Sequence, residues 1–198
     1  YLVAQPGSFI HPSMPVLYLS SGQESSICTD LLETIIVSDV RSFAQDPRFC
    51  LSVMAEIACR ALSPAVNDPG TAIDVIGRGV RILSAYAQNK IDETEVIYPS
   101  VHVAPLQIKD LLEDFFLPVA RDGASMREIQ IRVLKGLSML SKGWPGMFAE
   151  AAHILASETL EHATRTGHIA HDEYLIKSIY YNLFSGENPK EGANKFLI

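Results

Sequence analysis

Residues 41–71 read RSFAQDPRFCLSVMAEIACRALSPAVNDPGT, and this stretch decides the fold because it holds two helix starts. An aspartate precedes a proline at Asp46-Pro47 and again at Asp68-Pro69. The aspartate can accept hydrogen bonds from the free N–H groups of a first helical turn, and proline at the first helical position loses no hydrogen bond there. Ser63-Pro64 disfavours helical backbone between the two starts. The pattern predicts helices over residues 47–62 and 69–87.

The first of these helices is expected to lie at the centre of the molecule. Its polar residues recur at every fourth position, and apolar residues cover the rest of its circumference; the polar row is Arg48, Ser52, Glu56 and Arg60. We therefore expect neighbours on nearly every side, with one narrow polar stripe left open. The second helix is an ordinary amphipathic one, and its Gly77 and Gly79 indicate close packing against another helix.

Outward from this stretch, the chain predicts a mostly α (α+β) fold, a bundle of about six helices with a small N-terminal β element. Residues 1–4 and 16–19 are typical of two short strands around a Pro/Gly turn. Helical periodicity dominates from Thr29 onward. We treat residues 1–198 as a single soluble domain with a β element over 1–23, a helical core over 29–184 and a tail over 185–198.

Composition excludes several classes of protein. The chain of 198 residues is 47% hydrophobic, which is typical of a globular domain with a substantial core. A formal net charge of −7 argues against a nucleic-acid partner. Residues 1–23 carry no Asp, Glu, Lys or Arg, yet prolines at positions 6, 12 and 15 prevent that stretch from spanning a membrane as a helix.

The histidines do not predict a metal site. His162, His168 and His171 lie close in sequence, but their spacing lacks the i, i+4 pair that zinc ligands show on one helix. Surface histidines near helix ends are the favoured interpretation. No metal and no cofactor are expected, and G-x-S-x-G, the motif of a serine hydrolase, is absent from the sequence.

The strongest candidate site is the loop of residues 63–71 together with the polar stripe before it. Free N–H groups at a helix start, the Asn67 amide and the Arg60 guanidinium could hold a small polar or anionic ligand. The alternative is structural: Asn67 and Asp68 only close the turn, and Glu56 pairs with Arg60. We favour the structural interpretation and keep the ligand site as the second.

Two segments carry a family resemblance. ALSPAVNDPGTA (residues 61–72) and RSFAQDPRF (residues 41–49) resemble the signature of a bacterial family of uncharacterised predicted membrane proteins, with Cys50 standing where that signature has glycine. PGSF (6–9) and HPSMP (11–15) resemble the family's β turn, and the resemblance extends over about residues 1–140. It implies that this chain is a piece of a membrane-anchored protein, follows several transmembrane helices, and has its own transmembrane region as a partner. It implies no reaction.

Three hypotheses for function follow. The first is a soluble regulatory or ligand-binding domain on the cytoplasmic side, as three cysteines in no disulfide pattern favour. The second is a hydrolase-type enzyme with Glu56, Asp68 or a histidine as base, and the third is an oligomerisation module that builds a homo-oligomer. The candidate ligand-binding residues combine the polar stripe with the family motifs: Arg41, Gln45, Asp46, Glu56, Arg60, Asn67, Asp68 and Thr71.

Overall fold

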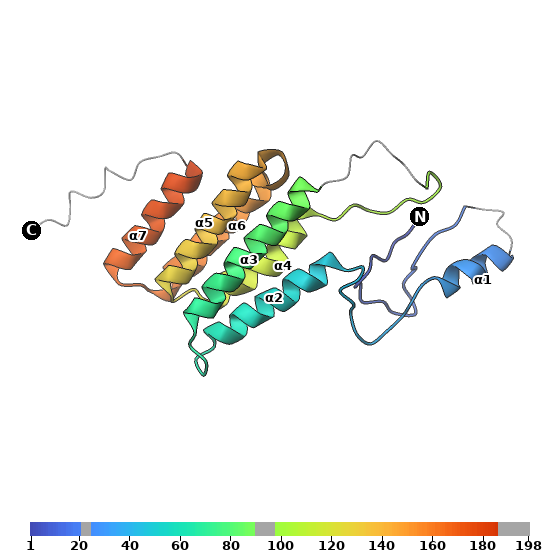
Figure 1. Ribbon diagram of the computed structural model, residues 1–198, viewed down its shortest axis with the longest axis horizontal. Helices are drawn as coiled ribbons and strands as arrows, with labels where there is room; N and C mark the ends of the chain where they lie inside the picture. Colours follow the sequence, from blue (N-terminus) through green and yellow to red (C-terminus); the bar gives the residue numbers. More distant parts are fainter. Residues whose placement is uncertain (21–24, 90–97, 186–198) are drawn as a thin grey trace, which may run out of the picture. The chain divides into compact units, whose positions relative to one another are not determined.

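The computed structural model describes residues 1–20, 25–89 and 98–185. Within these residues the chain forms seven α-helices and a final π-helical turn (Figure 1): α1 (Ser25–Glu33), α2 (Pro47–Leu62), α3 (Pro69–Gln88), α4 (Ile108–Asp122), α5 (Arg127–Gly143), α6 (Pro145–Thr166), α7 (Ala170–Tyr180) and the π turn Tyr181–Ser185. The predicted mostly helical fold is confirmed. The predicted tail, beyond its first residue, lies outside the described residues. In the described part of the chain, no helix has both the length and the hydropathy needed to cross a membrane.

The chain divides into two compact units. Unit 1 consists of Tyr1–Cys50 and Ile91–Leu106, and unit 2 consists of Leu51–Lys90 and Gln107–Ile198. Helix α2 begins in unit 1 and continues into unit 2. The two units are described separately below.

Unit 1 holds helix α1 and extended segments that pair only locally. Leu2 forms an antiparallel bridge with Leu17 and a parallel bridge with Val103. The Val3 N–H donates to the Val16 carbonyl at 2.9 Å. These bridges are isolated, and the described residues contain no strand, so the predicted N-terminal β element is not formed as strands. Pro6 and Pro15 flank the pairing and have no N–H to extend it.

Unit 2 is a helical bundle with α5 at its centre. Helix α5 contacts α3, α4, α6 and α7. In Figure 1, α4 lies behind α3 and α6 lies behind α5, so the four helices form two layers. Their apolar residues recur at helical spacing and face inward; the fully buried large side chains are Ile76, Leu83, Leu111, Leu112, Phe115, Phe116, Ile129, Leu134, Leu137, Leu140, Phe148 and Leu155.

Helix α2 is not the enclosed central helix that the sequence predicts. It buries one face, with Leu51, Ala55 and Ala58 in the core of unit 2. On its other sides Met54 is only half-buried and Ile57 is 48% exposed. The prediction was wrong because the apolar residues of a helix set only how much of its surface could be buried. How much of that surface is buried depends on which other segments pack against it.

Close helix packing occurs at one of the two predicted glycines. Gly79 is buried against the ring of Phe115 on α4, whereas Gly77 is exposed and an added Cβ there would meet no atom within 4 Å. The sequence assigned the same role to both residues. Only their place on the helix circumference distinguishes them.

Candidate functional site

The first Asp-Pro corner forms a buried cap at the start of α2. Asp46 is the only buried residue among the described residues of unit 1. Its Oδ1 accepts the Phe49 N–H at 3.0 Å, which satisfies one free donor of the first turn. Its Oδ2 accepts Nε of Arg41 at 2.7 Å, so the buried carboxylate has a charged partner.

Aromatic rings hold Arg41 in place. The guanidinium carbon lies 5.0 Å from the centroid of the Phe49 ring, within the range of a cation–π contact. The rings of Phe43 and Phe49 stack with centroids 4.6 Å apart. Neither terminal Nη nitrogen of Arg41 has a hydrogen-bond partner among the described residues.

Gly7 closes this group against the N-terminal turn. Its φ is +81°, in the left-handed region, and a Cβ at this position would lie 1.8 Å from Asp46 Oδ2. Only glycine fits there without a shift of the carboxylate. We refer to Gly7, Arg41, Phe43, Asp46 and Phe49 as the Arg41–Asp46 cluster.

The loop between α2 and α3 is held by its own backbone. The Asn67 N–H donates to the Ser63 carbonyl at 2.8 Å, and the Asp68 N–H donates to the Ala61 carbonyl at 2.8 Å. Asn67 has a φ of +48°, a conformation that asparagine tolerates better than most residues with a Cβ. These hydrogen bonds hold residues 63–68 as a turn between α2 and α3.

The second Asp-Pro corner caps α3. Asp68 accepts the Thr71 N–H at 3.0 Å and the Thr71 hydroxyl at 2.5 Å. These hydrogen bonds, first from the hydroxyl and then from the amide, lower the pKa of the Asp68 carboxyl below its ordinary value. A carboxylate with a lowered pKa is a weaker base, which argues against Asp68 in the hydrolase hypothesis.

The remaining predicted residues stand apart. Glu56 and Arg60 are exposed on α2, and no ion pair between them occurs in the described structure. Gln45 and Asn67 are also exposed. The structure therefore joins Arg41 to Asp46 in unit 1 and Asp68 to Thr71 in unit 2, and it does not join the rest of the predicted set.

Sequence reasoning missed a polar contact between α2 and α4. Burial raises the pKa of the Cys59 thiol to about 12, and a hydrogen bond to Asp122 and the charge of that carboxylate add to the effect. Desolvation acts to raise the pKa of Asp122, but hydrogen bonds from Arg121 and Cys59 outweigh it and lower that pKa. Nothing in the sequence signals this pair, because Cys59 and Asp122 are far apart along the chain.

A buried amide was also missed. Gln130 is fully buried in α5, and its Nε2 donates to the carbonyls of Ala120 and Gly123 at 2.9 Å each. Its Oε1 has no hydrogen-bond partner in the part of the chain that the structure describes. The available signal was a glutamine beside the apolar row of Ile129 and Val133. In the described residues, no group of three or more His, Cys, Asp or Glu side chains is placed to hold a metal ion.

Comparison with known proteins gives one family match. The family model described as "Predicted membrane protein (DUF2254)" matches residues 1–139. Uncharacterized proteins of Mycobacterium bovis and of Mycobacterium tuberculosis are each 61% identical to this chain over 36 residues, 18% of this chain. The match covers 7% of the length of each of these relatives. No solved structure matches the chain.

Proposed function

The chain belongs to this family of predicted membrane proteins (DUF2254), and on that premise we propose that it is a regulatory domain that acts by docking unit 1 against another surface. A docking domain keeps the regulatory role that the sequence suggested. In this proposal the binding surface is unit 1 and not the loop of residues 63–71.

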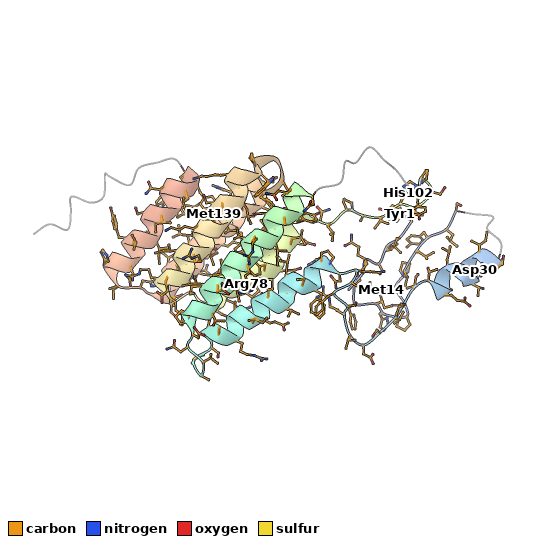
Figure 2. The ribbon with its side chains drawn as sticks, viewed as in Figure 1. Tyr1, Met14, Asp30, Arg78, His102 and Met139 are labelled. Atoms are coloured by element: carbon orange, nitrogen blue, oxygen red, sulfur yellow. The ribbon has the colours of Figure 1, made fainter. Side chains whose placement is uncertain are left out.

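The observation that carries the proposal is the distribution of apolar side chains. Every buried apolar residue of the described chain belongs to unit 2, and the described residues of unit 1 bury none. Unit 1 instead exposes fifteen large apolar side chains: Tyr1, Val3, Phe9, Met14, Tyr18, Leu19, Ile27, Leu32, Ile36, Val37, Val40, Phe43, Tyr98, Val101 and Val103. Tyr1 and Met14 are labelled in Figure 2.

The energetic argument follows from this distribution. Scattered apolar residues are normal on a protein surface, but so many in a unit without a core of its own are typical of an interaction surface. Covering one large apolar side chain contributes about 1.5–3 kcal/mol. Phe9 and Ile36, at 90% and 91% exposure, therefore leave much of this free energy unused in the isolated chain.

Helix α2 runs from unit 1 into the core of unit 2, and this continuity supports a regulatory role. Helix α2 begins at the Arg41–Asp46 cluster, and its later turns supply Leu51, Ala55 and Ala58 to the core of unit 2. A docking event that disturbs the cluster would change the cap of a helix on which the bundle depends. Loss of such a cap costs about 0.5–2 kcal/mol.

Photo-crosslinking in host cells tests the proposal. Phe9 or Ile36 is replaced by p-benzoylphenylalanine, and Met139, an exposed residue of α5 in unit 2 labelled in Figure 2, is the matched control. We expect crosslinked adducts, to protein or to lipid, from positions 9 and 36 and none from position 139. Equal labelling from all three positions would show that unit 1 has no special partner.

Anion binding at Arg41 is the second candidate function. Its side chain is held through Nε and over a ring, so the two Nη nitrogens, which have no partner among the described residues, form a fixed fork that suits phosphate or carboxylate. Calorimetric titration with inorganic phosphate tests this. Arg41→Lys should abolish the binding heat and Arg78→Lys on α3 should not; an unchanged heat for Arg41→Lys excludes the fork.

A cytoplasmic location is part of the proposal. Cys28, Cys50 and Cys59 are all free thiols, which suits a reducing compartment. A membrane-impermeant maleimide should label Cys28 only after the cells are permeabilised. Labelling in intact cells would put the domain on the other side.

A further inference from the structure

We infer that the surface to which unit 1 docks is the interface of an uncharged, zwitterionic lipid bilayer, entered by two loop segments, residues 5–15 and 34–38. This inference rests on the proposed docking function. It is carried by three observations on these segments: their exposed side chains, their lack of acidic and basic residues, and the partial internal hydrogen bonding of their backbones.

The first segment places large apolar side chains on an uncharged stretch. Phe9 and Met14 are exposed there, and residues 1–20 contain no Asp, Glu, Lys or Arg. Entry of this segment into the apolar part of an interface therefore buries no charged side chain. Tyr1 and Tyr18, exposed beside it in sequence, are of the type enriched at membrane–water interfaces.

The backbone of the first segment pairs part of its donors internally. Pro6, Pro12 and Pro15 have no N–H. The Ser8 N–H donates to the Gln5 carbonyl at 3.0 Å, and the Met14 N–H donates to the His11 carbonyl at 2.8 Å. Each N–H group that is absent or already paired lowers the hydrogen bonding that the segment loses when it leaves water.

The second segment repeats the same features. Residues 34–38 read TIIVS and carry no charge, and Ile36 and Val37 are exposed. The Ile35 N–H donates to the Leu32 carbonyl at 3.1 Å, and the Thr34 hydroxyl donates to the Leu31 carbonyl at 2.7 Å. Two separate loops therefore combine exposed aliphatic or aromatic residues with backbones that are partly hydrogen-bonded within the loop.

The net charge of unit 1 distinguishes between possible partners of its exposed apolar loops. Its sequence holds eight acidic and two basic residues, a formal net charge of −6. A second copy would bring the same negative charge against it, and anionic headgroups would be repelled in the same way. A zwitterionic interface has no net charge and receives the apolar loops without that repulsion.

Flotation of the 198-residue chain with lipid vesicles tests the inference. We expect the chain to float with phosphatidylcholine vesicles, to bind less when part of the lipid is phosphatidylglycerol, and to keep its phosphatidylcholine binding when NaCl is raised. Phe9→Ser and Ile36→Ser should each lower the partition coefficient about tenfold, because each removes a large apolar side chain. Met139→Ser, the control in unit 2, should leave it unchanged.

Several results would overturn the inference. These are no binding to phosphatidylcholine, binding only to phosphatidylglycerol that NaCl abolishes, or equal partition of the Phe9→Ser and Met139→Ser variants. Analytical ultracentrifugation separates this failure from failure of the proposed function. A dimer that dissociates in Phe9→Ser would replace lipid by a second copy and keep the docking function, whereas a monomer without vesicle binding and without crosslinks at positions 9 and 36 would end both.

Discussion

Two glycines on helix α3 provide a matched test of the bundle packing. Gly79 faces α4, where an added Cβ would lie 2.1 Å from both Cε1 and Cζ of Phe115. Carbon atoms in contact are normally about 3.5–4.0 Å apart, so the ring or the helix would have to move. Phe115 is fully buried and meets Phe116 edge to face at a centroid distance of 4.8 Å, which restricts the movement of its ring.

The magnitude follows from comparing Gly79→Ala with Gly77→Ala. Both substitutions gain about 0.5–1 kcal/mol of helix propensity, because glycine is a poor residue inside a helix. Gly77 has open space, so only this gain applies there. Overpacking at Gly79 costs about 1–3 kcal/mol, and the depth of the clash puts it near the upper end. We expect Gly77→Ala to be more stable than Gly79→Ala by about 3 kcal/mol.

Urea unfolding measures this difference. Trp144, the single tryptophan, lies between α5 and α6 in the same unit and reports the transition by fluorescence. Phe115→Leu in the Gly79→Ala background should restore part of the lost stability, giving a favourable coupling in the double-mutant cycle. Equal unfolding free energies for the two alanine variants would refute the close approach of α3 to Phe115.

Three further predictions address the loop, the thiol and the cluster. In urea unfolding, Asn67→Ala should lower the free energy of unfolding by about 1 kcal/mol, because alanine disfavours the positive φ of this residue. Asn67→Gly should leave the free energy of unfolding unchanged. A loss of ligand binding or of phenotype in Asn67→Gly would instead assign the Asn67 side chain a function. The pKa of the Cys59 thiol is near 9 in the unfolded chain and about 12 in the folded one, so the free energy of unfolding should fall as pH rises above about 9. In urea unfolding measured across this pH range, Cys59→Ser should remove that part of the fall. Equal pH dependence in the variant and the parent chain would contradict the burial of the thiol. Gly7→Ala should speed hydrogen exchange of the Phe49 amide about tenfold, because the new Cβ displaces the capping carboxylate of Asp46. Gly167 also has a positive φ but has open space around it, so Gly167→Ala should not change this exchange rate. Identical rates for the two variants would argue against the Arg41–Asp46 cluster.

Helix ends were predictable because local chemistry sets them. The sequence predicted helices over 47–62 and 69–87, and the structure has Pro47–Leu62 and Pro69–Gln88. Asp68 caps α3 through Thr71, three residues away, so the signal lies within one turn of chain. The same holds for Gly167, which ends α6 in the left-handed conformation.

Surroundings of a side chain were not predictable in the same way. Helix α2 has the composition of an enclosed helix and is open on one side. The predicted ligand residues Glu56 and Arg60 are exposed on it and form no ion pair with each other in the described residues. Residues 1–4 and 16–19 have strand-like composition, yet they form isolated bridges only. The apolar residues of unit 1 were visible in the sequence, but their exposure was not.

By itself, the sequence determined the mostly helical class, the two capped corners, the break between α2 and α3, and the family resemblance in residues 41–72. Hydrogen bonds between residues a few positions apart encode these features. Only the tertiary structure decided that Gly79 and not Gly77 meets Phe115, that Cys59 contacts Asp122, that α5 is the central helix, and that unit 1 exposes its apolar residues. The hydrophobic effect has no direction along the chain, so which apolar faces meet depends on segments distant in sequence.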